Sequence, residues 1–578
     1  MLNYAYNRYI RNITHILLLY ASQNKYSTMK QTLIITFLFL GINAYSQELE
    51  NPIIDRLDSQ IEKYIDGISP GMAVGIVKNG ATVFEKYIGY SNLEHEIKID
   101  KNTSFNIASN AKQFTALCIL RLIEQDKLAL DDDIRKYLPE LYKEIGYKIT
   151  VSNLLTHTSG IRDVYGLWAL KGKDWYELFI DNDDAIELLQ SQTDLNFEPG
   201  KEYLYSNSNY ILLTEIVEKV TGIKFKDFSN SLFTELGMEN SSFLTNYMAI
   251  IPNKARPYGN WNGWREYPIV TELNGDGGLF TTLEDQLKWE QIIQQNNGKY
   301  LSTSIIDQSQ STIENVYFDN YGYGLMFGKY EGLDYTYHDG STGAYKTTFF
   351  RFIDKNLSII IISNNDNVPT NYLAQQLTDI VFELDINNDK YPSVPKKTER
   401  LKNFKSVIGN YKNADGTIIK ISEKDGSLFR EIYQREPVKM INEKQSLFHY
   451  ETNDKLKMNF SNIGKEQQKL TLYLATQEPS VYHKLPTEEI ENGYDTSLNG
   501  TYFNEETDTE IVIEHVKDVN YNIMKNGRKR DGKLITKDYL RMMSSYKIRV
   551  IRDKKGSIQG LNVENGRIKN VIFKKQSV

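Results

Sequence analysis

The chain has 578 residues, more than one ordinary hydrophobic core can hold, so about two to four domains are expected. Hydrophobic residues at 40% and charged residues at 25% are typical of globular proteins. The net charge of −7 is small, and lysine and arginine are dispersed, which argues against nucleic acid as a partner. The single cysteine, Cys118, excludes an internal disulfide.

The first element along the chain is a targeting signal. Residues 29–46 read MKQTLIITFLFLGINAYS, with a positive start, an apolar run and small residues before Gln47. The run is too short to span a bilayer comfortably, and no cysteine follows it to carry a lipid anchor. We expect a signal peptide at 29–46, an exported protein (periplasmic or extracellular), and no stable membrane span after cleavage. The alternative is an uncleaved N-terminal anchor. Because Met29 begins this signal, residues 1–28 are expected to be a gene-model extension.

The next elements predict helices and a sheet within one large domain at 47–390. Residues 53–65 place apolar side chains on one helical face, and two β-rich runs flank Asn79-Gly80, which indicates a hairpin. The run that begins at Ser109 is apolar nearly all round, so we expect a helix inside the protein. Residues 150–161 predict a short helix that ends at Gly160.

Strand-like runs dominate the last part of this domain. Turns separate the runs YGYGLMFGKY, DYTYHDG, YKTTFFRFI and LSIIIISNN, and residues 371–384 then predict a helix. A helix and hairpin at the start, with strands and a helix at the end, predict an α+β fold. Both ends of the domain would build one antiparallel sheet flanked by helices, and the helical middle would form a second lobe.

A polar segment containing two prolines predicts a linker at 391–400, and the pattern changes beyond it. Short alternating strands follow, and IGNYKNADGTIIKIS is echoed by LNGTYFNEETDTEIVIE. Each copy has Gly-x-Tyr, a turn and an alternating apolar strand. We expect two similar all-β units at 401–490 and 491–578, built as small barrels or sandwiches. Contact with the cell wall through these units is one role that the sequence leaves open.

A chemical pair opens the buried helix. Ser109 and Lys112 are three residues apart, so their side chains can lie on one helical face. A serine hydroxyl needs a nearby base to become a nucleophile, and burial or a neighbouring cation helps a lysine to give up its proton. The pattern alone is weak, because the alternative is Ser109 as a helix cap and Lys112 as a side chain that reaches solvent.

Two further segments follow in an informative order. EPGKEYLYSNSNYILL contains Tyr205 and Asn207, and YHDGSTGAY contains His338 and Gly340. With Ser-x-x-Lys, Tyr-x-Asn and His-x-Gly, the chain resembles the class C β-lactamase-like serine hydrolases of the penicillin-recognising superfamily. SNAKQFTA, LLTHTSGI and GDGGLFTT also resemble segments of that family, and the resemblance spans roughly residues 50–385. It implies a β-lactamase/DD-peptidase-like domain.

The resemblance also implies a role for each motif residue. Ser109 would be the nucleophile that becomes acylated, and Lys112 and Tyr205 would share the proton transfers. Which of them takes the first proton stays open. Asn207 would hold Lys112 and a substrate amide. His338 stands where true lactamases have lysine, and would steady Tyr205 or a leaving group.

Two more positions complete the implied site. Gly340 would let its strand approach the substrate closely. The backbone N–H groups of Ser109 and Ser341 would form the oxyanion hole, where one donor typically contributes about 10²–10³ in rate. Against these assignments, Tyr205 is one of 40 tyrosines and His338 can be an edge-strand residue.

Other residues carry weaker signals. His157 in THTSG is expected to shape a turn, and Asp276 in GDGG to form a turn beside the pocket. The seven histidines show no metal-ligand spacing, so neither zinc nor another cofactor is implied. The sequence shows no phosphate-binding glycine loop, which argues against a nucleotide enzyme.

The expected activity is therefore acyl transfer to water through an acyl-enzyme. His338 in place of lysine points away from an efficient β-lactamase and towards D-amino-acid peptidases or esterases, with a small molecule or peptide as substrate. A β-lactamase is the alternative within the same chemistry. The alternative of another class is a binding or scaffold protein that keeps the fold without the activity.

Overall fold

The computed structural model describes residues 49–577, apart from the segments 174–177, 315–319, 385–403, 414–416, 432–436, 445, 466, 475–476, 486–494 and 543–545. The predicted signal peptide and the linker predicted at 391–400 lie outside the described residues. The chain divides into two compact units, residues 1–55 and 56–578. The second unit contains every element from β1 onward, and helix α3 (Asn51–Glu62) crosses the division.

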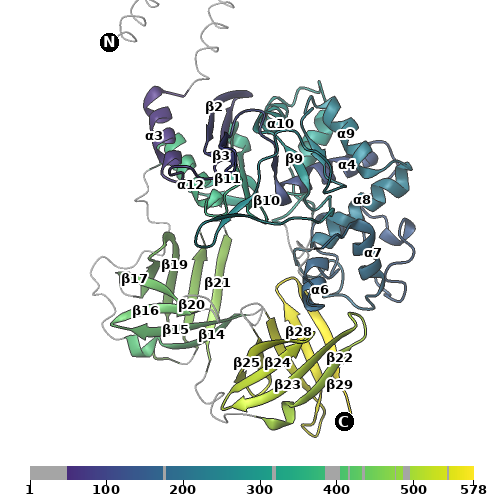
Figure 1. Ribbon diagram of the computed structural model, residues 1–578, viewed down its shortest axis with the longest axis vertical. Coiled ribbons are helices and arrows are strands. Elements are labelled where there is room, and N and C mark those ends of the chain that lie inside the picture. The colour runs from purple at the N-terminus through teal and green to yellow at the C-terminus, as the bar shows by residue number, and fades with distance from the viewer. Residues whose placement is uncertain are drawn as a thin grey trace, which may run out of the picture. The chain divides into compact units, whose positions relative to one another are not determined.

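An antiparallel sheet is the centre of the N-terminal domain (Figure 1). Its strand order is β10-β11-β12-β13-β1-β2. The strands are β1 (Met72–Lys78), β2 (Ala81–Ile88), β10 (Met326–Tyr330), β11 (Leu333–Thr342), β12 (Tyr345–Phe352) and β13 (Leu357–Ser363). Asn79 and Gly80 have φ of 52° and 74°, the left-handed pair that a two-residue hairpin needs. The prediction of one sheet built from both ends of the domain is confirmed.

Helices cover both faces of this sheet. Helix α10 (Leu283–Gln295) packs on the face that carries Gly75, where a Cβ would lie 2.7 Å from the Leu287 side chain. Helix α12 (Thr370–Val381) packs against β12 and β13. Every residue of β13 is buried, as expected for a strand covered on both sides.

The middle of the domain forms a helical lobe around the buried helix α4 (Lys112–Glu124). The other helices are α5 (Val151–Leu155), α6 (Val164–Leu170), α7 (Asn182–Gln190), α8 (Asn207–Thr221), α9 (Phe225–Glu235) and α11 (Thr303–Ser309). Small pairings complete it, from β3 (Tyr90–Asn92), β4 (Ile97–Lys98), β5 (Phe105–Asn106), β6 (Ser242–Phe243), β7 (Tyr258–Asn260), β8 (Trp264–Glu266) and β9 (Leu279–Thr281). Helix α4 contacts α8, α9 and α11, which explains its apolar pattern on all sides.

One helix is shorter than the sequence predicts. Helix α5 ends at Leu155, not at Gly160, because His157 adopts a left-handed φ of 56° that interrupts the helix. Gly160 instead lies in the following loop at φ 73°, where a Cβ would stand 2.1 Å from the Phe197 carbonyl oxygen. The glycine is needed for that close approach.

Two closed eight-stranded barrels follow, so the predicted α+β domain with C-terminal barrel-like units is confirmed. The first contains β14 (Gly409–Asn413), β15 (Ile418–Lys424), β16 (Ser427–Glu431), β17 (Val438–Lys444), β18 (Leu447–Tyr450), β19 (Asn453–Ser461), β20 (Lys469–Leu474) and β21 (Gln477–Lys484). The second contains β22 (Gly500–Asn504), β23 (Thr509–Lys517), β24 (Asn520–Lys525), β25 (Arg528–Thr536), β26 (Tyr539–Met542), β27 (Tyr546–Arg552), β28 (Ile558–Asn565) and β29 (Ile568–Lys575).

The sequence echo corresponds to the first strand of each barrel. The Tyr411 hydroxyl donates to the Val407 carbonyl at 2.8 Å, and the Tyr502 hydroxyl donates to the Leu498 carbonyl at 2.9 Å. The two tyrosines therefore tie each barrel to the short helical turn before it in the same way.

The second barrel is joined to the N-terminal domain through Arg162. This side chain is 1% exposed. Its guanidinium donates to the Glu506 carboxylate at 2.6 Å and to the carbonyl oxygens of Lys569 and Asn570 at 3.2 and 2.9 Å. Because a buried arginine is costly unless all its donors are matched, these bonds fix the barrel against the domain.

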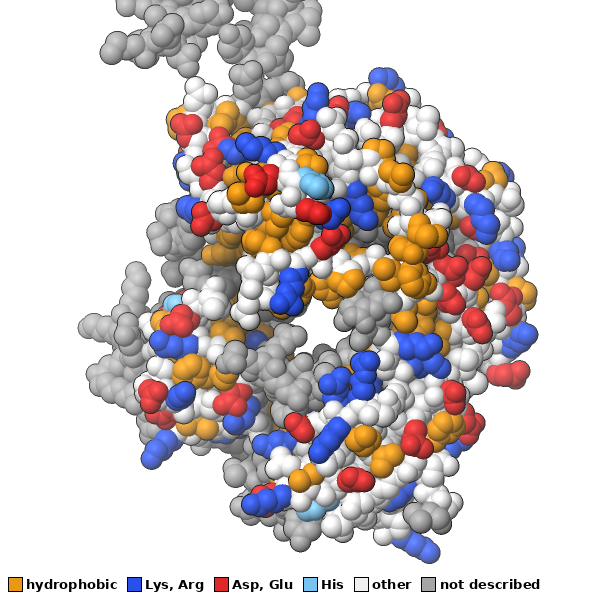
Figure 2. Space-filling model, in the orientation of Figure 1, with side chains coloured by type: hydrophobic (Ala, Val, Ile, Leu, Met, Phe, Trp, Pro, Cys, Tyr) orange, Lys and Arg blue, Asp and Glu red, His pale blue; other side chains and the backbone are white. Residues whose placement is uncertain are grey.

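The surface matches the small net charge. Acidic and basic side chains are interspersed over the face shown in Figure 2. Over the described ranges, no helix is both long and apolar enough to cross a membrane.

Candidate active site

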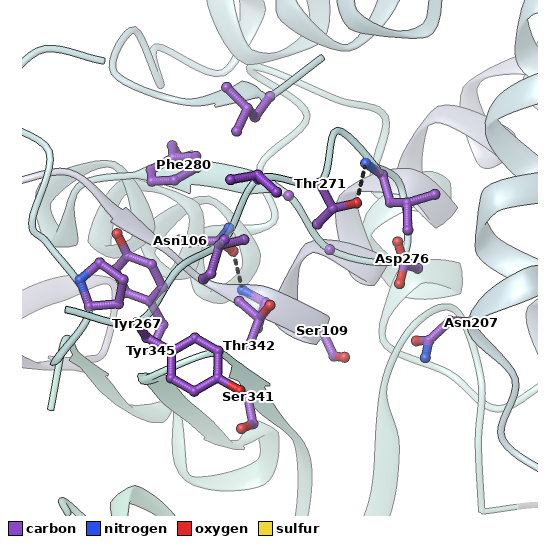
Figure 3. Close-up of a pocket in the computed structure, with 18 of the residues that line it drawn as sticks. Asn106, Ser109, Asn207, Tyr267, Thr271, Asp276, Phe280, Ser341, Thr342 and Tyr345 are labelled. Atoms are coloured by element: carbon purple, nitrogen blue, oxygen red, sulfur yellow. Dashed lines mark hydrogen bonds between the residues drawn. The ribbon is translucent and has the colours of Figure 1, made fainter. Parts of the chain in front are cut away.

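Ser109 lies on a 3₁₀ turn, Ala108–Ala111, between β5 and α4. Ala108 adopts a left-handed φ of 49°, and its N–H donates to Asn106 Oδ1 at 2.8 Å. The turn brings Ser109 to the wall of a cavity of about 510 Å³. Figure 3 shows Ser109 between the side chains of Asn207 and Asp276 and the strand that carries Ser341 and Thr342.

Lys112 is completely buried, and its ammonium has three acceptors. Nζ donates to Ser109 Oγ at 3.2 Å, to Asn207 Oδ1 at 3.0 Å and to the carbonyl oxygen of Asp276. An ammonium has three N–H donors, so each of them is matched. The lysine is therefore placed for Ser109, and the alternative of a side chain that reaches solvent is excluded.

Asn207 is oriented by a buried carboxylate that the sequence analysis did not identify. Asn207 is the first residue of α8, and both its backbone N–H and its Nδ2 donate to Asp163 Oδ2, at 2.8 and 3.0 Å. Asp163 also caps α6 by accepting from the Gly166 N–H at 3.1 Å. Because Asp163 takes the amide nitrogen, Asn207 turns its oxygen towards Lys112.

Tyr205 completes the group beside the lysine. Lys112 Nζ lies 5.0 Å from the centre of its ring. The imidazole of His157 packs 4.2 Å from the same ring, centre to centre, and accepts from the Ser206 N–H at 3.2 Å. His157 thus supports Tyr205 as well as the turn. Within the described part of the chain, the buried Tyr205 hydroxyl has no hydrogen-bond partner. An unmatched buried polar group calls for an explanation, and a role in catalysis is one such explanation.

His338 lies on β11 and is 2% exposed. Its Nε2 is 3.1 Å from the Tyr321 hydroxyl and its Nδ1 2.8 Å from the Asp339 carbonyl oxygen, while its ring centre is 6.0 Å from that of Tyr205. Burial and the charge of Lys112 lower the pKa of His338 to about 3. It is therefore a neutral imidazole that reaches Tyr205 by ring contact, with its hydrogen bond directed to Tyr321.

The two other positions implied by the resemblance lie on the same strand. Ser341 lines the cavity, as Ser109 does, so both residues of the predicted oxyanion hole lie at the same cavity. At Gly340 a Cβ would lie 2.5 Å from the Ile107 carbonyl oxygen. In the structure Gly340 lets β11 approach the segment that carries Ser109, in addition to the approach to substrate that the resemblance implies.

Asp276 contributes more than the predicted turn. Its backbone carbonyl accepts from Lys112, and its Oδ2 accepts from the Tyr165 hydroxyl at 2.8 Å. Burial raises the pKa of Asp276, and Lys112 partly opposes that shift. The glycine-rich sequence around Asp276 predicted a turn, but it could not show that Tyr165 would meet its carboxylate.

The remaining lining divides the cavity into polar and apolar parts. The apolar part is formed by Leu244, Pro257, Tyr267, Pro268, Ile269, Val270, Leu273, Phe280 and Tyr345. The polar part around Ser109 includes Arg567, which comes from the second barrel. No group of three or more His, Cys, Asp or Glu side chains among the described residues is arranged to hold a metal ion.

The fold and this site define a serine hydrolase of the penicillin-recognising type. The family described as Beta-lactamase matches residues 57–381, more than half of the chain. The chain belongs to this family of serine hydrolases.

Individual relatives are distant. "Penicillin-binding protein 4*" of Bacillus subtilis is 25% identical over 379 residues, 61% of this chain and 82% of that protein. A "D-aminopeptidase" of Gluconobacter oxydans is 28% identical over 324 residues, 54% of this chain and 60% of the relative. The solved structure of the octameric penicillin-binding protein homologue from Pyrococcus abyssi covers 75% of this chain and 99% of its own, with 21% identity and a TM-score of 0.54. That last similarity concerns the fold alone.

Tyr205→Phe separates catalysis from stability. Because the hydroxyl has no partner to lose, we expect the free energy of unfolding to change by less than about 0.5 kcal/mol. Loss of a group that transfers protons should lower kcat/KM by about 10²–10⁴. Tyr142→Phe is the matched control, because it removes another buried, unpartnered hydroxyl from a residue outside the group around Lys112. Equal activity in the two variants would contradict a proton-transfer role for Tyr205.

The two buried histidines should make the fold sensitive to acid. Burial holds the pKa of His338 at about 3 and that of His157 well below 6.5, so both stay neutral in the folded chain while an unfolded chain protonates them. The contribution of His338 to stability is complete above pH 6.5 and is lost as the pH falls towards 3, at about 1.4 kcal/mol per pH unit. That of His157 is lost in the same direction below pH 6.5. Urea unfolding at pH 7.5 and pH 5.0 measures this loss. In His338→Gln the loss should be smaller by roughly 2 kcal/mol, and an unchanged loss would refute the assignment.

Proposed function

We propose that this protein is an exported serine hydrolase that forms an acyl-enzyme at Ser109, and that it cleaves the amide bonds of D-amino-acid-containing peptides or small esters. One observation carries the proposal. The fully buried ammonium of Lys112 lies 3.2 Å from Ser109 Oγ, at the wall of a cavity large enough for a small substrate.

The hydrogen bonds of Lys112 favour Tyr205, and not Lys112, as the group that first accepts the proton of Ser109. All three N–H groups of Lys112 point to acceptors, and one of these acceptors is Ser109 Oγ itself. An ammonium in this arrangement stabilises negative charge on the serine oxygen but has no lone pair with which to take its proton. Tyr205, which lies beside this cation, is the group that takes the Ser109 proton as Oγ bonds to the substrate carbonyl carbon.

The same groups then act in reverse. The Tyr205 phenol gives its proton to the leaving amine or alcohol as the scissile bond breaks, which leaves the acyl group on Ser109. Water attacks that ester, its proton passes to Tyr205, and Ser109 recovers a proton as the acid product departs. The backbone N–H groups of Ser109 and Ser341 are assigned to the developing oxyanion in both halves.

The lining of the cavity supports the choice of substrate. The lining combines polar residues such as Ser109 with apolar residues such as Leu244 and Phe280, which suits an amide or ester that carries an apolar side chain. The relative named D-aminopeptidase points in the same direction. A β-lactamase is the second candidate, because the matching family bears that name, and His338 in place of lysine stands against it.

A probe and a substrate panel test the proposal. A fluorophosphonate should label the protein from Gln47 onward, and Ser109→Ala should abolish labelling because the nucleophile is lost. Among D-aminoacyl amides, D-alanyl-D-alanine peptides, p-nitrophenyl esters and nitrocefin, we expect the amides and esters to be cleaved faster than nitrocefin. Nitrocefin as the best substrate would favour the β-lactamase. Folded wild-type protein that takes up no label would favour the binding or scaffold alternative.

Export is part of the proposal and rests on residues 29–46. Outside the cytoplasm the enzyme would meet peptidoglycan peptides, and its C-terminal barrels would be free to contact the cell wall. Expression of the full-length gene in its natural host tests the location. We expect protein recovered outside the cytoplasm to begin at Gln47, as read by N-terminal sequencing. An intact segment on cytoplasmic protein would reject export.

A further inference from the structure

The second barrel contributes a cation to the cavity. Strands β28 and β29 are joined by a hairpin turn at Gly566 and Arg567, and Arg567 lines the same cavity as Ser109. The barrel thus supplies a residue to the wall of the active site as well as packing against the domain.

The backbone at this turn is held by the N-terminal domain. Asn196 Nδ2 donates to the Arg567 carbonyl oxygen at 3.2 Å, and Asn196 Oδ1 accepts from the Lys569 N–H at 2.6 Å. The Asp163 N–H also donates to the Arg567 carbonyl at 3.5 Å. Both sides of the turn are therefore anchored, which holds the Arg567 backbone in place beside the domain.

The guanidinium is held in position by contacts that use almost none of its hydrogen-bonding capacity. It lies over the Tyr205 ring, with Cζ 4.7 Å from the ring centre. Its nearest carboxylate oxygen is Asp163 Oδ2 at 3.8 Å, which is beyond hydrogen-bond distance. Asp163 Oδ2 already accepts twice from Asn207. Among the described residues no acceptor lies within hydrogen-bond distance of the Arg567 side chain.

Arg162 shows what a structural arginine looks like in this protein. Its side chain is 1% exposed and donates to Gln192, Glu506 and two backbone carbonyls. The Arg567 side chain is 49% exposed, carries five N–H donors, and belongs to a residue that lines the cavity. A planar fork of donors of this kind matches a carboxylate in a bidentate manner.

We propose that Arg567 is a specificity-determining residue that binds a carboxylate of the substrate, so that the enzyme prefers acidic D-peptides over their neutral counterparts. This inference rests on the proposed hydrolase function, because it treats the bound carboxylate compound as a substrate. The binding of a carboxylate by Arg567 does not depend on that function. The carboxylate is either the free C-terminus of a peptide or the side chain of an acidic residue, and both present the same group to the guanidinium.

Binding to the full chain with Ser109→Ala tests the inference separately from turnover. The three ligands are N-acetyl-D-alanyl-D-alanine, its C-terminal amide, and the C-terminal amide of N-acetyl-D-alanyl-D-glutamate. Calorimetry should give at least one carboxylate ligand a dissociation constant lower than that of the neutral amide. Adding Arg567→Gln should reduce that preference about 10- to 100-fold, the range expected for a hydrogen-bonded charge. Arg567→Lys should restore part of it.

Lys569→Gln is the matched control on the same hairpin. Lys569 pairs with Glu202 at 3.0 Å and does not line the cavity, so its loss should leave the preference unchanged. An unchanged preference in Arg567→Gln, an equal fall in both variants, or no binding of any carboxylate ligand would each overturn the inference. If wild-type protein hydrolyses none of the peptides while Ser109→Ala binds a carboxylate ligand through Arg567, the proposed function fails and the binding site stands. Comparison of the two carboxylate ligands shows whether the site binds a C-terminal carboxylate or the carboxylate of an acidic side chain.

Discussion

The burial of one charged amine organises the catalytic half of this protein. An isolated ammonium in a protein interior is strongly unfavourable unless its donors are matched. Each of the three N–H groups of Lys112 has an acceptor: a serine side chain, an asparagine side chain and a backbone carbonyl. These acceptors come from the turn before α4, the start of α8 and the loop before β9. The requirement of one ammonium therefore brings together three distant parts of the chain.

The groups that bind Lys112 are in turn held in place by further polar contacts. Asn207 is oriented by Asp163, and Asp163 also caps α6, whose first turn carries Tyr165 to Asp276. Aromatic rings fill the space around this network: His157 supports Tyr205, and Tyr321 holds His338. The ammonium of Lys112 therefore lies within hydrogen-bond distance of the Ser109 hydroxyl and faces the ring of Tyr205.

The sequence predicted local structure and spaced motifs well. The hairpin at Asn79-Gly80, the shared sheet and the repeated barrels follow from turn chemistry and alternation, which depend on neighbouring residues. Resemblance to a family brought Ser109, Lys112 and Asn207 to attention, and the structure places them within hydrogen-bond reach of one another. Asp163 and Tyr165 were missed because their roles depend on tertiary contacts, and neither residue stands in a recognisable pattern. The sequence could not identify Arg567 for the same reason. Nothing in the local sequence of a hairpin turn in a C-terminal barrel indicates that its arginine lines the same cavity as a distant serine.

The position of the barrel hairpin has an evolutionary consequence. Substitutions at the tip, Gly566 and Arg567, alter one wall of the cavity while the bonds around Lys112 remain intact. A lineage can therefore change one wall of the cavity by substitutions in a hairpin turn that supplies no bond to Lys112.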